Sequence, residues 1–274
     1  MGTAWTDFRP QLENLSSAKR VVVSYDPRGY GRSRPPSRTF PIDFYHIDAE
    51  DAAGVMAALG YPRYAVMGWS DGANSGVLLA ARYPERVVKL IIFGGNAYIT
   101  DQGSDPFPRC LVAWSLFFFS SSLLVEFIIS LSLSLSLSLT LSTSDVKLIL
   151  QTKSLASWSD RMRESLLAVY GEDLQPMWTQ YCETVEQMAK KEKGNVCAKE
   201  CAAVKCESLI LHGEMDPMVS PEHPHYFAAH IEHSRLLLFP EGKHNIHLRY
   251  SDKVNQLVEQ FLQDKLLLLS NSKL

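Results

Sequence analysis

The chain has 274 residues, of which 46% are hydrophobic and 21% are charged, and its formal net charge is -3. A chain of this size can bury a large apolar core as one large or two small globular domains. The slightly acidic balance argues against a nucleic-acid-binding protein, which needs a basic face.

The cysteines and the first residues indicate an intracellular protein. Three of the five cysteines lie close together, at positions 197, 201 and 206, without a CxxC pair or a matching set of histidines. This spacing favours reduced thiols over a disulfide framework or a zinc site. The opening MGTAWTDFRPQ lacks the basic and then apolar pattern of a secretory signal. We expect a cytoplasmic or mitochondrial protein.

Strands and helices alternate in the first hundred residues. Residues 20–25, RVVVSY, predict a strand, and a helix with apolar residues at helical intervals follows over 43–59. A strand over 64–69, a helix over 70–83 and a strand over 87–95 come next. Because these strands are apolar on both faces, they predict an α/β fold with a mostly parallel sheet flanked by helices.

The same pattern returns near the end of the chain. Amphipathic helices over 157–191 interrupt the sheet as a lid would. A strand and loop over 206–216, a helix over 221–231 and a strand and loop over 234–247 then follow, with a last helix to about Gln263.

Residues 111–142 are rich in alternating leucine and serine, with Glu126 as the only charge. The tract is longer than the ~20 apolar residues that cross a bilayer, so one interpretation is a membrane helix. The alternation also matches a half-buried strand. The third and simplest interpretation is a translated CT-dinucleotide repeat, that is, retained non-coding sequence.

These patterns divide the chain into five segments. They are an N-terminal part of the core (1–103), a low-complexity apolar insertion (104–152), a helical lid (153–203), a C-terminal part of the core (204–263) and a tail (264–274).

The stretch Gly68-Trp69-Ser70-Asp71-Gly72 fits the pattern G-x-S-x-G at a predicted strand-to-helix junction. In that setting the serine occupies a tight, strained turn, and we expect both glycines to be needed to avoid collisions. The turn exposes the hydroxyl, and the helix that follows supplies backbone N–H groups to an oxyanion. Ser70 is therefore a candidate nucleophile.

A nucleophilic serine needs a base and an acid that orients the base. Asp216 follows one predicted strand and His244 follows the next, at the same edge of the sheet as Ser70. Glu214 is the alternative acid and His247 the alternative base, although His247 suits the first turn of a helix better.

The remaining histidines suit structural roles. His212 precedes the loop of the candidate acid and is expected to support that turn. Four others belong to the predicted helix over 221–231 or to its exit, where solvation or packing explains them; they are His223, His225, His230 and His233.

Four stretches, YDPRGYGRSRPP, GWSDG, HGEMDPMV and PEGKHNIHLR, occur in this order. Together they resemble the α/β-hydrolase superfamily and are most similar to the biphenyl hydrolase-like proteins, whose best-known activity is valacyclovir hydrolase. The likeness covers roughly 2–110 and 153–263. It implies cofactor-free hydrolysis of α-amino acid esters, with Ser70 as nucleophile, His244 as base and Asp216 as orienting acid.

Asp71 is an unusual neighbour for a nucleophile, since a carboxylate repels the oxyanion formed in acyl transfer. The resemblance implies that Asp71 pairs with the ammonium group of the substrate. At an effective dielectric constant of ~20, opposite charges 4 Å apart attract by roughly 4 kcal/mol before desolvation. The alternative is a solvated aspartate at a helix N-terminus. Trp69 is either a wall of the substrate pocket or part of the core.

The backbone N–H of Asp71 is the first expected oxyanion donor, and the family takes the second from a loop after an early strand. That loop has no counterpart in the sequence, so we expect the first strand or two and the second donor to be missing. A truncated, impaired isoform is therefore one hypothesis.

The prediction is a serine esterase, monomeric, with a small-molecule ester substrate and neither nucleic acid nor membrane as partner. A C–C bond hydrolase of the same fold is one alternative, although the residue after the nucleophile is generally apolar there. A non-catalytic binding module and a protein tethered to a membrane by 111–142 are the others.

Overall fold

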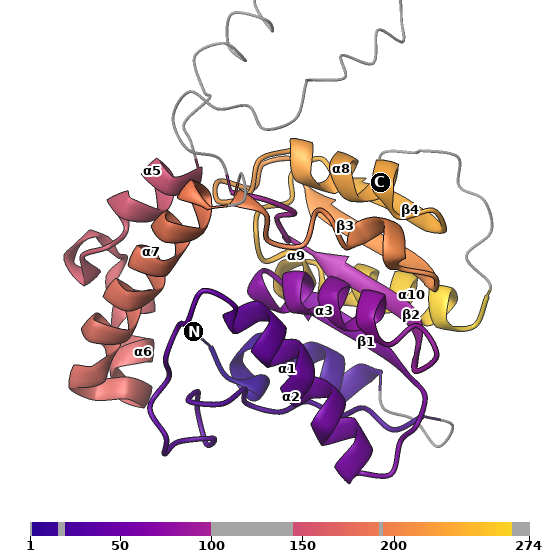
Figure 1. Cartoon of the computed structure of the whole chain (residues 1–274), viewed down its shortest axis with the longest axis horizontal. Helices are drawn as coiled ribbons and strands as arrows, with labels where there is room; N and C mark the ends of the chain where they lie inside the picture. The colour runs from indigo at the N-terminus through magenta and orange to yellow at the C-terminus, as the bar shows by residue number, and fades with distance from the viewer. Residues whose placement is uncertain (1, 16–19, 100–144, 192–193, 265–274) are drawn as a thin grey trace, which may run out of the picture.

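The computed structural model describes residues 2–15, 20–99, 145–191 and 194–264. Within these residues, four parallel strands form one sheet in the order β1-β2-β3-β4 (Figure 1). The strands are β1 (Tyr64–Trp69), β2 (Val87–Phe93), β3 (Glu207–Gly213) and β4 (Ser234–Phe239).

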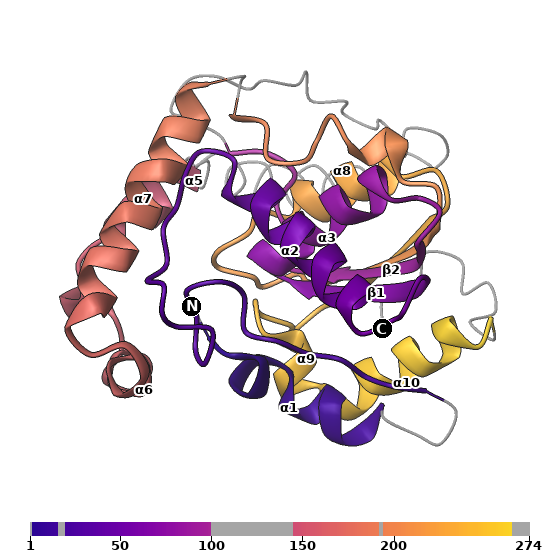
Figure 2. The same cartoon turned by 60° about the horizontal axis from the view of Figure 1, so that its bottom comes forward.

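Helices cover both faces of the sheet (Figure 2). The layer over one face consists of α2 (Phe44–Ala58), α3 (Asp71–Arg82) and α8 (Glu222–His230). The layer over the other face consists of α1 (Ala4–Asn14), α9 (Ile246–Arg249) and α10 (Ser251–Leu262).

The side chains of β2 show why the sheet needs both layers. Leu90 and Ile92 are buried in the apolar cluster that includes α2, α3 and α8. Ile91 and Phe93 are buried in the second cluster, with side chains of α9 and α10. Because successive side chains of a strand point to opposite faces, a run of apolar residues fills both clusters.

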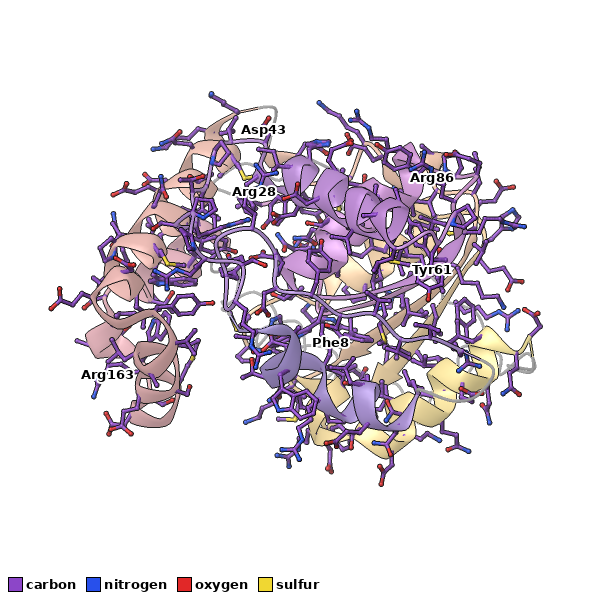
Figure 3. All side chains as sticks on the ribbon, turned by 90° about the horizontal axis from the view of Figure 1, so that it is seen from below. Phe8, Arg28, Asp43, Tyr61, Arg86 and Arg163 are labelled. Atoms are coloured by element: carbon purple, nitrogen blue, oxygen red, sulfur yellow. The ribbon has the colours of Figure 1, made fainter. Side chains whose placement is uncertain are left out.

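A group of helices stands beside the sheet where a lid was predicted. It consists of α5 (Asp145–Gln151), α6 (Asp160–Tyr170) and α7 (Leu174–Lys190). The Thr184 hydroxyl of α7 donates a hydrogen bond of 2.6 Å to the Phe40 carbonyl, which docks the group on the core. Figure 3 shows Arg163 on α6, on the side of the lid helices that faces away from the sheet. The described residues also contain the short 3-10 helices η1 (Leu155–Ser157), η2 (Gly171–Asp173) and η4 (Cys201–Ala203).

The predicted strand over 20–25 is wrong. Residues 21–27 carry no strand, and Val21 is 64% exposed. β-branched residues form a strand only where a neighbouring strand shares its hydrogen bonds. In the described part of the chain the sheet ends at β1, and Arg20 instead pairs with Glu259 of α10.

The other predicted strands and helices of the core are confirmed, with ends that differ by a few residues. Residues 145–151, predicted to belong to the insertion, form α5, and the Cys182 thiol of α7 contacts the Ile149 carbonyl at 3.9 Å. The leucine- and serine-rich tract over 111–142 lies outside the described residues, as does the tail from 265 onwards. No helix in the described ranges is long and apolar enough to span a bilayer.

Candidate active site

Ser70 occupies a strained turn between β1 and α3. Its backbone angles are φ 56° and ψ -123°, which a residue with a side chain rarely adopts outside functional sites. The Ser70 N–H donates a hydrogen bond of 2.9 Å to the Phe93 carbonyl at the end of β2. The turn therefore lies at the carboxyl edge of the sheet, where the sequence predicted it.

The two glycines of the turn differ in their surroundings. A Cβ atom at Gly68 would lie 2.2 Å from the Gly72 carbonyl oxygen, so only glycine fits there. A Cβ atom at Gly72 would meet nothing within 4 Å beyond its own helix. The prediction that both positions require glycine is right for Gly68 and wrong for Gly72, because the turn approaches other atoms closely only at its first glycine.

Asp216 and His244 are brought together by the loops after β3 and β4. His244 Nδ1 lies 2.8 Å from Asp216 Oδ2, and only 1% of the aspartate side chain is exposed. The other carboxylate oxygen accepts the N–H groups of Met218 and Val219, at 2.8 and 3.1 Å. Asp216 is therefore positioned to orient the histidine.

The contact between Asp216 and His244 fixes the charge of the carboxylate and the tautomer of the neutral imidazole. Burial by itself raises the pKa of the Asp216 carboxyl, but the hydrogen bond and charge of His244 outweigh it and lower the pKa below its usual value. An ionised carboxylate only accepts hydrogen bonds, so in the neutral form of His244 the proton lies on Nδ1 and the lone pair on Nε2. His244 is therefore prepared to take up a proton at Nε2.

His244 is held close to the turn that carries Ser70. The Trp69 indole N–H donates a hydrogen bond of 2.8 Å to the His244 carbonyl. A Cβ atom at Gly94, just after β2, would lie 3.0 Å from the imidazole. The Ser70 side chain makes no hydrogen bond to His244 in the described structure, and such bonds are often long without substrate.

His247 and His212 support the site without facing it. His247 is fully buried, donates one hydrogen bond of 2.9 Å from Nε2 to the Asp7 carbonyl, and stacks on Phe93. Since a carbonyl only accepts, Nε2 carries the proton. Burial lowers the pKa of His247 to about 4 and that of the buried His212 to about 4. Both histidines are therefore neutral packing residues, as the sequence suggested.

Trp69 packs against this histidine loop. Its ring centroid lies 5.3 Å from that of His244 and 4.6 Å from that of His247. These contacts pack the partly buried indole against the core beside the strand, and a role of Trp69 as a wall of the substrate pocket stays a prediction.

Asp71, the first residue of α3, is half-buried and accepts two phenol hydrogen bonds. Its Oδ1 accepts the hydroxyl of Tyr45 on α2 at 2.7 Å and that of Tyr181 on α7 at 3.1 Å. Burial, and then the negative charge of Asp71, raise the pKa of both phenols well above the usual value. Asp71 is therefore not the freely solvated helix-capping residue of the alternative interpretation.

Asp71 forms no ion pair with a cation among the described residues, although the charge of Arg38 acts on it from nearby. The nearby guanidinium of Arg38 is instead engaged by Asp48 through two hydrogen bonds of 2.7 Å each. Asp71 Oδ2 accepts no hydrogen bond there, and it is not among the fully buried polar atoms that lack a partner. This oxygen is accordingly not fully buried.

The oxyanion donor predicted at Asp71 lies in the first turn of α3. N–H groups in the first turn of a helix have no partner within the helix. The Asp71 N–H follows the serine directly, which is the position used by α/β-hydrolase sites.

Sequence reasoning did not find Tyr45 and Tyr181. They lie 26 and 110 residues from Asp71, on a core helix and on a lid helix. Neither stands in a recognisable motif, so only the folded chain brings them to the site. The described residues contain no group of three or more His, Cys, Asp or Glu side chains that could hold a metal ion.

Comparison with known proteins agrees with this geometry. The family described as alpha/beta hydrolase fold matches residues 2–249. The chain is 38% identical over 267 residues to "Serine hydrolase BPHL" of Homo sapiens, covering 96% of this chain and 76% of that protein. It is 36% identical over 264 residues to the Mus musculus protein of the same name, with the same shares covered.

Solved structures agree at the level of fold. A meta-cleavage product hydrolase from Pseudomonas fluorescens superimposes with a TM-score of 0.64 at 19% identity, over 95% of this chain and 86% of that one. A 2-hydroxy-6-oxo-6-phenylhexa-2,4-dienoate hydrolase from Rhodococcus gives a TM-score of 0.66 at 16% identity, with the same shares covered. The chain therefore belongs to the α/β-hydrolase fold family and is a serine hydrolase related to the biphenyl hydrolase-like proteins.

Proposed function

We propose that the chain hydrolyses carboxylic esters, preferably those of α-amino acids, through a covalent acyl-enzyme. In this proposal Ser70 is the nucleophile, His244 the general base and Asp216 the acid that orients the base. The contact of 2.8 Å between His244 and Asp216, beside the strained turn of Ser70, supports these roles.

The reaction has two stages. Ser70 Oγ attacks the ester carbonyl carbon while His244 Nε2 takes the hydroxyl proton, and the Asp71 N–H donates to the oxyanion. The C–O bond of the ester then breaks, and the alkoxide leaves with the proton from His244. A water molecule, deprotonated by His244, then attacks the acyl carbonyl; the bond to Ser70 Oγ breaks, the acid leaves, and His244 returns the proton to Ser70.

The observation that carries the amino acid preference is the charge of Asp71, which forms no direct ion pair among the described residues. This half-buried carboxylate adjoins the nucleophile, and the nearby guanidinium of Arg38 is hydrogen-bonded to Asp48 instead of to Asp71. An α-ammonium group close to the scissile carbonyl supplies the missing charge and offsets the repulsion of the oxyanion.

The same charge opposes the alternative of a C–C bond hydrolase. A structural relative of that class is named as acting on a dienoate, which is an anion. Because the identity to that relative is low, the likeness supports only a shared fold. The negative charge of Asp71 would repel an anionic substrate. We therefore favour cationic esters.

Labelling with a fluorophosphonate tests the nucleophile. We expect the chain to be labelled at Ser70 and Ser70→Ala to lose both labelling and cleavage of a p-nitrophenyl ester. Ser75→Ala, on the same helix, is the matched control and should retain both. A chain that binds esters without labelling or turnover would support the binding-module alternative.

Substitution of Asp71 tests the substrate class. The kcat/KM for valine p-nitrophenyl ester should exceed that for the isovalerate ester, which lacks only the amino group. Asp71→Asn should remove most of this preference while Ser70 remains reactive to the fluorophosphonate. An unchanged preference would refute the role of Asp71 in substrate selection.

A further inference from the structure

The hydroxyls of Tyr45 and Tyr181 converge on one oxygen of Asp71. Both donate to Oδ1, at 2.7 and 3.1 Å, and leave Oδ2 without a hydrogen bond in the described structure. A carboxylate held by one oxygen presents the other in a fixed direction. The two oxygens of Asp71 therefore have different surroundings.

Both phenols are themselves fixed by packing. The Tyr45 ring lies 4.0 Å from the Phe44 ring and is buried. The Tyr181 ring stacks on Trp178 at 4.9 Å and meets Phe40 edge-on at 5.4 Å. The rotamers of side chains packed in this way are restricted, so their hydroxyls are preorganised.

The Tyr45 and Tyr181 phenols also stay neutral at and well above neutral pH. Burial raises the pKa of each well above its usual value. A neutral phenol can donate its O–H to Asp71, whereas a phenolate would repel it. The hydrogen bonds consequently persist wherever Asp71 is ionised.

We propose that Tyr45 and Tyr181 are specificity-determining positioning residues that hold Asp71 so that its free oxygen receives the ammonium group of the substrate. The inference rests on the proposed function and adds that the lid helix α7 takes part in selecting the amine. Orientation of a charged group is expected to matter strongly, since small misplacements near a reacting bond cost large factors in rate.

The test uses Tyr45→Phe, Tyr181→Phe and the double variant, which keep the rings and remove the hydroxyls. We compare kcat and KM for valine p-nitrophenyl ester with those for the isovalerate ester. In the double variant the preference for the amino ester should fall by about tenfold or more, mainly through KM, because the ammonium contact is lost. The isovalerate ester should change by less than about threefold, since it does not use Oδ2.

Tyr83→Phe is the matched control, because the Tyr83 hydroxyl donates a bond of 2.7 Å to the carboxylate of Glu50, a residue not assigned to the site. This variant should retain the wild-type preference. An equal loss for both esters in the double variant would show that the phenols merely support the lid, and an unchanged preference would show that they only fill space. Either result overturns the inference.

Asp71→Asn separates this inference from the proposed function. If Asp71→Asn removes the preference and the double tyrosine variant does not, only the inference fails. If the wild-type chain shows no preference for the amino ester, the proposed substrate class fails and the inference with it.

Discussion

The Trp69 indole N–H donates a hydrogen bond of 2.8 Å to the His244 carbonyl. The residue before the proposed nucleophile thus anchors the backbone of the proposed base. Since Ser70 and His244 share no direct hydrogen bond in the described structure, this contact helps to set their separation.

Trp69→Phe should therefore lower kcat for ester hydrolysis. A misplaced base slows proton transfer, and we expect a loss of roughly 3- to 10-fold. The lost hydrogen bond should cost about 0.5–1.5 kcal/mol of stability, and the smaller ring adds a further loss of packing. Steady-state kinetics and urea unfolding measure the two effects.

Trp158→Phe is a suitable control for Trp69→Phe. Its indole N–H donates a comparable bond of 2.9 Å, to the Thr152 carbonyl in the lid. Equal losses of kcat in the two variants would contradict a specific role for Trp69.

Gly94 contacts the other side of the histidine. A Cβ atom there would lie 3.0 Å from the His244 ring, and the glycine has φ 60°. Gly94→Ala should displace the imidazole and lower kcat by about tenfold or more. The left-handed backbone should add a stability cost of about 1–2 kcal/mol.

Gly171→Ala is a control that separates the effect of backbone strain from the effect of displacing the His244 imidazole. Gly171 has φ 57°, but a Cβ atom there would meet nothing within 4 Å. Both variants should lose stability, and only Gly94→Ala should lose activity. If Gly171→Ala lowers kcat as much, backbone strain alone explains the effect.

Much of the site followed from the sequence because of one geometric rule. Ser70, Asp216 and His244 each come after a predicted strand, and parallel strands place their carboxyl ends at one edge of the sheet. Contact between Asp216 and His244 could therefore be expected before the loops were seen, and the 2.8 Å distance agrees.

Other features depend on the whole chain. The run over 20–25 has strand-forming residues, but propensity cannot reveal whether a neighbouring strand is present. The two phenols on Asp71 come from helices whose sequence patterns report only burial. Their meeting at one oxygen depends on how α2 and α7 pack, which local patterns do not encode.

The glycines of the nucleophile turn should respond differently to substitution. Gly68→Ala places a Cβ atom 2.2 Å from the Gly72 carbonyl, so we expect a loss of about 2–3 kcal/mol and of activity. Gly72→Ala meets no such atom and lies within α3, where alanine favours the helix by about 0.5–1 kcal/mol. Thermal unfolding of the two variants would contradict this account if both were destabilised alike.

Two buried histidines should make stability depend on pH. Burial lowers the pKa of His212 and of His247 to about 4, from an ordinary value of 6.5. Between these pH values the unfolded chain binds more protons than the folded one. The stabilising contribution of the two neutral histidines is therefore fully present above pH 6.5 and is lost as the pH falls towards 4. Each histidine contributes a slope of about 1.4 kcal/mol per pH unit.

Substitution of one histidine isolates its share of that slope. Burial raises the pKa values of Asp7 and Asp48, so these two carboxyls make the folded chain more stable as the pH falls. Because this opposes the effect of the histidines, variants are compared at matched pH. His247→Gln keeps a donor for the Asp7 carbonyl and should reduce the slope of unfolding free energy between pH 6 and 5 by about 1.4 kcal/mol per unit. His46→Gln, at an exposed position, is the matched control. Urea unfolding at pH 5, 6 and 7 measures the slope, and equal slopes in His247→Gln and the wild type would show that His247 is not held neutral by the fold.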